Sequence, residues 1–197
     1  MTTTTIAYPR TRARRLGGRT RKTVLLTHIL AAGVWLGLDA AMAVLVFTAV
    51  GTDDQGTRGF ALQALELVTV WPMFVAGALS LATGILLGLG GKYGLVRYWW
   101  VLVKLVLNIV LCLLVLFALR TGVAEAAATG RALAAGAGIT WTPGDIVFPP
   151  IVSPAALLVA YVLSVFKPWG RVMPPAAAHR SPGGPAAAAP ARGRSAR

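Results

Sequence analysis

The sequence predicts an all-α protein: a polytopic membrane protein whose four transmembrane helices form a bundle. Two observations lead to this prediction. Of the 197 residues, 56% are hydrophobic and only 13% are charged, whereas charged residues make up about 25% of an ordinary soluble domain. The hydrophobic residues also gather in four long runs, and roughly 20 such residues in a helix cross the hydrocarbon core of a bilayer.

The clearest of the four runs is the third, which spans residues 98–119 between Arg97 and Arg120. It is apolar except for Lys104 and Asn108. The aromatic cluster that opens it, YWW, suits the headgroup boundary, where an amphipathic ring meets both phases. A cation at the depth of Lys104 costs at least about 2.5–3.5 kcal/mol if nothing satisfies it. This residue is therefore the first pointer to a functional site.

The other three runs predict the remaining spans. The first covers residues 24–50, and the second covers 60–89, where Pro72 should kink the helix because it lacks an N–H group. The fourth, 149–166, is short and has several prolines near its start. Since proline is tolerated in the first turn of a helix, we expect the regular helix to begin at Pro154.

The segments outside these runs predict no soluble domain. Residues 1–22 form a basic cytoplasmic arm, 23–170 the transmembrane domain, and 171–197 a tail rich in Pro, Ala and Arg. We expect the arm and the tail to be disordered, because neither has apolar periodicity. Between the third and fourth spans, residues 121–136 are Ala-rich enough for a short helix.

The distribution of Lys and Arg predicts the orientation. These residues concentrate before the first span, between the second and third, and after the fourth. The positive-inside rule then places both termini in the cytoplasm of a multi-pass protein of the cytoplasmic membrane. The net charge of +13 accordingly indicates topology and attraction to anionic lipid rather than nucleic-acid binding.

The polar residues of the first and third spans each share one helix face. Helical spacing brings His28, Trp35 and Asp39 to one face of the first span, and Lys104 and Asn108 to one face of the third. Intramembrane polar residues rarely face lipid. We therefore expect both faces to point into the bundle.

On the second span, Gly77 and Gly84 lie on the same face as Glu66, and small residues there would let helices approach closely. The candidate site residues are His28, Trp35, Asp39, Lys104 and Asn108, with Glu66 as a secondary candidate.

The depths of the ionisable residues predict two pairs. His28 and Lys104 both enter from the inner side and form an inner pair, whereas Asp39 and Glu66 form an outer pair. Simpler alternatives stay open: Lys104 reaching to the inner headgroups, His28 and Glu66 as interfacial residues, Asp39 as a paired structural residue, and Trp35 as core packing.

Two segments resemble known families. LTHILAAGVWLGLDAAM and YWWVLVKLVLNIVLCLLVL have a His followed by Trp-x-Gly and a Trp-x-x-x-Lys-Leu pattern. In these motifs the chain is similar to uncharacterised actinobacterial four-helix integral membrane proteins, to the copper-resistance protein D group and to the HemJ-type protoporphyrinogen oxidases. The residues that carry the resemblance are His28, Trp35, Gly37, Trp100, Lys104 and Leu105.

The resemblance implies a haem-linked role for His28 and Lys104, because the matching residues of HemJ-type enzymes are implicated in haem binding and activity. The chain departs from that pattern, since its other histidine, His179, lies in the tail. One chain cannot then supply two intramembrane His ligands. The single cysteine also excludes a CxxC motif. We expect no metal site and no cofactor, with haem b on His28 as the alternative.

Three functional hypotheses remain open. The leading one is a structural or helper membrane component without enzyme activity, which contacts the lipid bilayer and packs against another membrane protein or a second copy of itself. The second is a haem-linked or other redox membrane protein that uses His28 and Lys104. The third is a small transporter or proton-pathway protein that uses Asp39, Glu66 and Lys104.

The predicted orientation can be tested with reporter fusions. Fusions at Gly56 and Gly136 should report a periplasmic location, and a fusion at Gly91 a cytoplasmic one, because the basic loops all fall on one side. A cytoplasmic signal at Gly56 would contradict the four-span topology.

Overall fold

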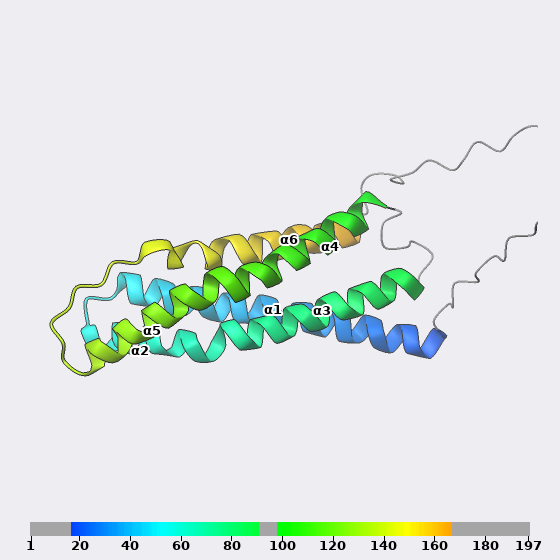
Figure 1. Ribbon diagram of the computed structural model, residues 1–197. Coiled ribbons are helices and arrows are strands. Elements are labelled where there is room, and N and C mark those ends of the chain that lie inside the picture. The colour runs from blue at the N-terminus through cyan, green and yellow to red at the C-terminus, as the bar shows by residue number, and fades with distance from the viewer. Residues whose placement is uncertain (1–16, 91–97, 167–197) are drawn as a thin grey trace, which may run out of the picture.

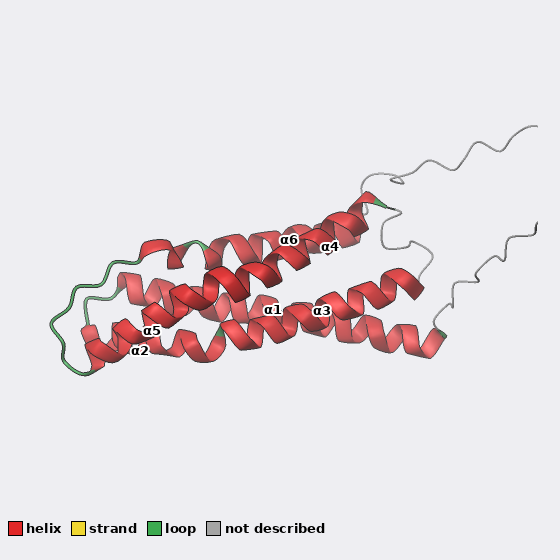
Figure 2. Cartoon of the chain, viewed as in Figure 1, coloured by secondary structure: helices red, strands yellow, loops and turns green. Residues whose placement is uncertain are grey.

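The computed structural model describes residues 17–90 and 98–166 (Figure 1). This part of the chain is almost entirely helical and contains no strand (Figure 2). The predicted all-α four-helix bundle is thereby confirmed. The predictions of disorder for residues 1–16 and 171–197 fall outside the described residues.

Four helical runs among the described residues are long and apolar enough to cross a membrane, as a multi-pass membrane protein requires. The first is α1 and the second is α2 followed by α3. The third joins α4, the π-helical turn η1 and α5, and the fourth joins the 3-10 turn η2 to α6. Their bounds are α1 Gly18–Gly51, α2 Gln55–Val68, α3 Val70–Gly90, α4 Trp99–Leu114, η1 Val115–Leu119, α5 Arg120–Ala134, η2 Gly144–Val147 and α6 Pro149–Phe166.

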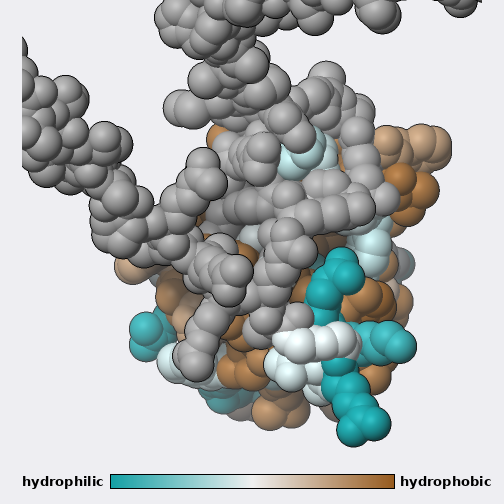
Figure 3. Space-filling view, turned by 90° about the vertical axis from the view of Figure 1, so that its right-hand side faces the viewer, coloured by the Kyte–Doolittle hydropathy of each residue, from teal (hydrophilic) through white to brown (hydrophobic). Residues whose placement is uncertain are grey.

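Helix α1 begins at Gly18, so residues 18–22 belong to the helix and not to the arm that the sequence predicts. The first turns carry Arg19, Arg21 and Lys22, all of them exposed. Hydrophilic side chains project from this end of the molecule beside hydrophobic surface in Figure 3. The basic residues extend the helix because Lys and Arg are good helix formers.

The second span is interrupted near Pro72, as predicted. Helix α2 ends at Val68, Thr69 leaves the helical conformation with φ −98° and ψ −101°, and α3 begins at Val70. Pro72 then lies in the first turn of α3. It has no N–H to donate to the carbonyl of Val68, and its ring would clash with that carbonyl in a continuous helix.

The third span continues well beyond the membrane core. Residues 99–134 form one helical run of 36 residues, about 54 Å long at ~1.5 Å per residue, against roughly 30 Å for the hydrocarbon core. The short helix predicted in 121–136 is therefore present as α5, joined to the span without a break. The π-helical turn η1 lies between the two parts and was not expected.

Helix α6 begins at Pro149, earlier than the predicted start at Pro154, which lies inside the helix. The reason is that the first residues of a helix have no intrahelical partner for their N–H groups, so Pro149 and Pro150 cost no hydrogen bond there. Only Pro154 removes a bond, the one to the carbonyl of Pro150.

The four spans close into a ring. Helix α1 packs against α3 and α6, and α4 packs against the same two helices from the other side. The start of α1, the end of α3, the start of α4 and the end of α6 lie at one end of the bundle (Figure 1). At the other end α2 packs chiefly on α5. The largest fully buried side chains are Trp35, Met42, Val46, Leu62, Leu65, Met73 and Val123.

Helices α2 and α5 cross at two glycines. A Cβ added at Gly130 would lie 2.7 Å from the carbonyl oxygen of Gly59 and 3.0 Å from Leu62 Cβ. Gln63 Nε2 donates to the carbonyl oxygens of both glycines at 3.2 Å. The backbones approach so closely that neither position has room for a side chain.

This crossing gives a stability prediction with a matched control on the same helix. Gly130→Ala should destabilise the protein by about 1–3 kcal/mol, because its methyl group meets backbone that cannot yield cheaply. Gly122→Ala, where nothing lies within 4 Å, should leave stability unchanged or raise it by about 0.5–1 kcal/mol. Thermal unfolding in detergent measures both. Equal melting temperatures for the two variants would contradict the crossing.

Candidate functional site

His28 of α1 hydrogen-bonds to residues of α3. Its Nδ1 lies 2.9 Å from the carbonyl oxygen of Ser80 and 3.1 Å from Thr83 Oγ1. A carbonyl only accepts hydrogen bonds, so Nδ1 carries the proton in this contact. A Cβ added at Gly84 would lie 3.3 Å from His28 Cε1. Gly84 thus faces α1, as the sequence predicts, and leaves room for the imidazole.

The polar contacts continue from Ser80 to α4. Asn108 Nδ2 donates to Ser80 Oγ at 3.3 Å, and Cys112 Sγ donates to Asn108 Oδ1 at 3.5 Å. His28, Ser80, Asn108 and Cys112 therefore form one hydrogen-bonded row, which we call the inner row. It joins α1, α3 and α4 inside the bundle.

Trp35 continues this line toward the other end of the bundle. It is fully buried, and a Cβ added at Gly77 would lie 2.5 Å from Trp35 Cζ3 and 2.9 Å from Cys112 Sγ. Gly77 therefore faces another helix, as the sequence predicts, and only glycine fits there. Trp35 Nε1 is buried and has no hydrogen-bond partner among the described residues.

Asp39 lies one turn beyond Trp35 on α1 and is fully buried. Its Oδ2 accepts a hydrogen bond from Ser153 Oγ of α6 at 2.9 Å. Its Oδ1 is buried without a partner in the described part of the chain. Leaving a buried acceptor unpaired costs about 1–3 kcal/mol and more for a charged group. The unpaired oxygen of Asp39 carries such a cost unless something outside the described residues satisfies it.

Lys104 hydrogen-bonds to α6, whereas His28 hydrogen-bonds to α3. Its Nζ donates to Ser164 Oγ of α6 at 2.8 Å and lies 4.7 Å from the centroid of the Trp100 ring. A charged ammonium is attracted to the face of an aromatic ring. Lys104 and Ser164 consequently link α4 to α6 near the end of the bundle where α6 stops.

Glu66 lies at the surface and not beside Asp39. Its Oε2 is 2.9 Å from Arg131 Nη1, and both side chains are 55% exposed. An exposed pair of this kind contributes about 0–1 kcal/mol. Asp39 and Glu66 do not form the outer pair that their depths suggest, since one is buried against α6 and the other faces out on α2.

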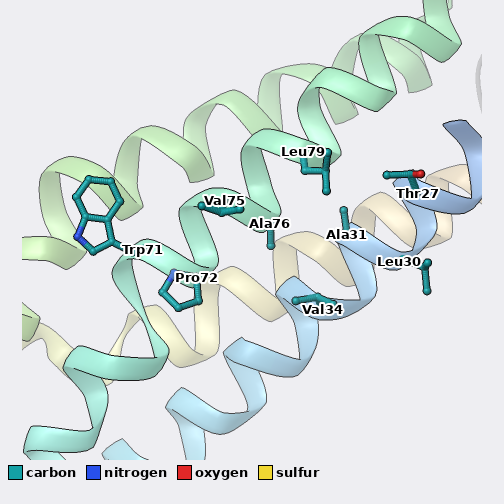
Figure 4. A pocket seen from close by; sticks show the side chains of 9 residues that line it. All are labelled: Thr27, Leu30, Ala31, Val34, Trp71, Pro72, Val75, Ala76 and Leu79. Carbon is teal, nitrogen blue, oxygen red and sulfur yellow. The ribbon is translucent and has the colours of Figure 1, made fainter.

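A groove between α1 and α3 has a volume of about 550 Å³. Trp71 stands toward one end and Thr27 toward the other (Figure 4). Apart from the indole N–H of Trp71, its lining has one polar side-chain group, the hydroxyl of Thr27, and Thr27 Oγ1 donates to the carbonyl of Thr23. The described residues also contain no group of three His, Cys, Asp or Glu that could hold a metal ion.

Comparison of the chain with protein-family models, with curated proteins and with solved structures gives no match. The functional argument therefore rests on the chain's own residues.

Ser153 and Ser164 are site residues that the sequence analysis missed. Their signal was their polarity in an otherwise apolar span, but spacing alone did not connect them to Asp39 and Lys104.

The Asp39–Ser153 contact can be tested by a double-mutant cycle. Ser153→Ala should cost about 1–3 kcal/mol of stability when Asp39 is present, because it leaves the second carboxylate oxygen unpaired. It should cost little in an Asp39→Leu background. The coupling energy expected from thermal unfolding is about 0.5–3 kcal/mol.

The matched control is the pair Asp39 and Ser164, which share no contact. Their effects should add to within about 0.5 kcal/mol. Additive effects for Asp39 and Ser153 would show that the two residues do not interact.

Proposed function

We propose that this chain is a multi-pass protein of a bacterial cell membrane, with both termini in the cytoplasm, that provides a route for protons through Asp39. The orientation is supported by the basic residues at one end of the bundle. Arg19, Arg21 and Lys22 lie at the start of α1, and the ends of α3 and α6, which precede Lys92 and Lys167 in the sequence, lie at that same end (Figure 1). The positive-inside rule assigns this end to the cytoplasm.

The single observation that carries the proposal is the burial of Asp39 with one carboxylate oxygen unpaired. A purely structural position of this kind would be as stable or more stable with an apolar residue. Ionisable residues inside membrane bundles mark proton relays and ion pathways. Asp39 has one proton-accepting oxygen, Oδ1, that no described group occupies.

Groups that can donate and accept protons lie on both sides of Asp39 along the bundle, with Ser153 in direct contact. Ser153 hydrogen-bonds Oδ2 from the first turns of α6, close to the outer end of that helix. On the inner side, His28 and Ser80 can each donate and accept a proton. Asn108 donates to Ser80 Oγ and so orients the Ser80 hydroxyl. Glu66, which the sequence-based version of this hypothesis included, faces out to Arg131 and takes no part.

A haem-linked role fits the described geometry less well. The Nδ1–H of His28 donates to a backbone carbonyl, as in many ligating histidines. Lys104 Nζ, however, donates to Ser164 Oγ and lies 4.7 Å from the centroid of the Trp100 ring, so it is already used in contacts with α6 and α4. The two residues therefore do not fit a haem held between them. The helper hypothesis remains a prediction that leaves the burial of Asp39 without an explanation.

Proton flux in vesicles tests the proposal. The purified protein, reconstituted in liposomes with an internal pH dye, should dissipate an imposed pH gradient faster than protein-free liposomes. Asp39→Asn keeps the shape of the side chain and removes its titratable proton, so its rate should fall to that of protein-free liposomes. Glu66→Gln removes an exposed carboxylate and should behave as the unsubstituted protein.

Two outcomes would overturn the proposal. One is a rate for the unsubstituted protein that equals that of protein-free liposomes. The other is full flux in Asp39→Asn.

A further inference from the structure

Two buried polar atoms on α1 lack partners, and they are chemically complementary. Trp35 Nε1 carries a hydrogen to donate and Asp39 Oδ1 can accept one, and neither finds a partner in the part of the chain that the structure describes. Both side chains are 0% exposed. The great majority of buried polar side-chain atoms are hydrogen-bonded to protein or to ordered water. Two orphans one helical turn apart therefore call for one explanation.

We propose that Trp35 Nε1 and Asp39 Oδ1 bind one ordered water molecule inside the bundle. Residues four apart on a helix share a face and have Cβ atoms about 5–6 Å apart, so both side chains enter the same part of the interior. One water with two hydrogen bonds of about 2.9 Å joins polar atoms up to roughly 5.8 Å apart. The water accepts from the indole N–H and donates to the carboxylate oxygen. Both orphan atoms are satisfied by this single molecule.

The pair of atoms selects water over an ion. A cation would be attracted to Asp39 Oδ1 but repelled by the indole N–H, and an anion would be repelled by the carboxylate. A molecule that accepts one hydrogen bond and donates another satisfies both, and water is the smallest such molecule. A buried water needs two to four polar partners, and Trp35 and Asp39 supply two.

The orientation of Trp35 is compatible with this role. Its six-membered ring contacts Gly77 and lies beside Cys112 through Cζ3 and Cη2. The nitrogen belongs to the other ring of the indole, so it is not part of the contact with α3. Packing at Gly77 therefore fixes the indole while the N–H group remains available to a small ligand.

The π-helical turn η1 is a second feature at the same level. Trp35 and Cys112 meet at Gly77, and α1 and α4 start at the same end of the bundle (Figure 1). Asp39 follows Trp35 by four residues, and η1 begins at Val115, three residues after Cys112. The turn thus begins level with Asp39. Single π-helical turns inside α-helices occur frequently at functional sites.

The water would extend the hydrogen bonds of Asp39 by one turn toward the inner row. Its binding rests on burial and hydrogen-bonding capacity alone, whereas its place in a proton route rests on the proposed function. Trp35 is then a positioning residue, because it holds the water and does not itself titrate.

Nuclear magnetic resonance of the full chain in detergent tests the site, with the indole nitrogens labelled with ¹⁵N. The Trp35 signal is identified by its loss in Trp35→Phe, and the remaining indole signals report whether each variant is folded. We expect a cross-relaxation peak between the Trp35 indole hydrogen and water, with the sign of a long-lived bound molecule. Absence of this peak in the unsubstituted protein would overturn the proposal.

Two variants distinguish a peak that arises from bound water from one that arises by hydrogen exchange through the hydroxyl of Ser153. The peak should persist in Ser153→Ala, because Ser153 contacts the other oxygen of Asp39. It should disappear in Asp39→Leu, which removes the accepting oxygen. Loss in Ser153→Ala, or survival in Asp39→Leu, would each contradict a water held by Trp35 and Asp39.

The outcome is distinguishable from a failure of the proposed function, because this measurement needs no proton flux. A water peak without flux would remove only the proton route, and flux that depends on Asp39 without the peak would remove only the water. Trp35→Phe keeps the ring and removes the donor. Its flux should fall if the water belongs to the route, and unchanged flux would exclude that role.

Discussion

The interior of this bundle is governed by the inability of hydrocarbon to hydrogen-bond a polar group. Each polar side chain must find its partner within the protein. Lipid tails are as apolar as leucine, so close packing and hydrogen bonds hold the helices together instead of a hydrophobic driving force. The inner row and the two serines of α6 meet this demand, and all of their contacts except the one between Cys112 and Asn108 join different helices. Asp39 Oδ1 and Trp35 Nε1 are buried atoms that have no hydrogen-bond partner among the described protein groups.

The spans could be predicted because their length follows from bilayer thickness and the period of an α-helix is fixed. The same period brought His28, Trp35 and Asp39 to one face, and that face points inward. A kink in the second span was expected because Pro72 lacks an N–H group, and the interruption lies three residues earlier, at Thr69. The glycines at 77 and 84 were expected to face another helix, since their only advantage there is the absence of a side chain.

The partners of these residues could not be predicted, because they depend on the order and tilt of the helices around the ring. Nothing in the spacing of Asp39 connects it to Ser153, which is far away in the sequence. The hydrogen bond from Lys104 to Ser164 of α6 was not predicted, because matching depth with His28 does not determine which further neighbours a side chain contacts. The continuation of the third span into α5 was missed for a different reason. Hydropathy marks where apolar residues end, whereas a helix continues as long as its backbone hydrogen bonds do.

The contact at Gly77 fixes α1, α3 and α4 relative to one another more firmly than α6 is fixed to them. Trp35, Gly77 and Cys112 interlock three spans at one point, so α1, α3 and α4 cannot slide or rotate past one another without forcing an indole into backbone. Helix α6 has polar links at two positions, through Ser153 to α1 and through Ser164 to α4. The serines are eleven residues apart, or about 16 Å along the helix. Hydrogen bonds can break and form again with new partners, whereas steric contacts do not yield. Any rearrangement of the bundle would therefore be a shear of α6 against a rigid trio, with the Asp39–Ser153 bond among the first to break.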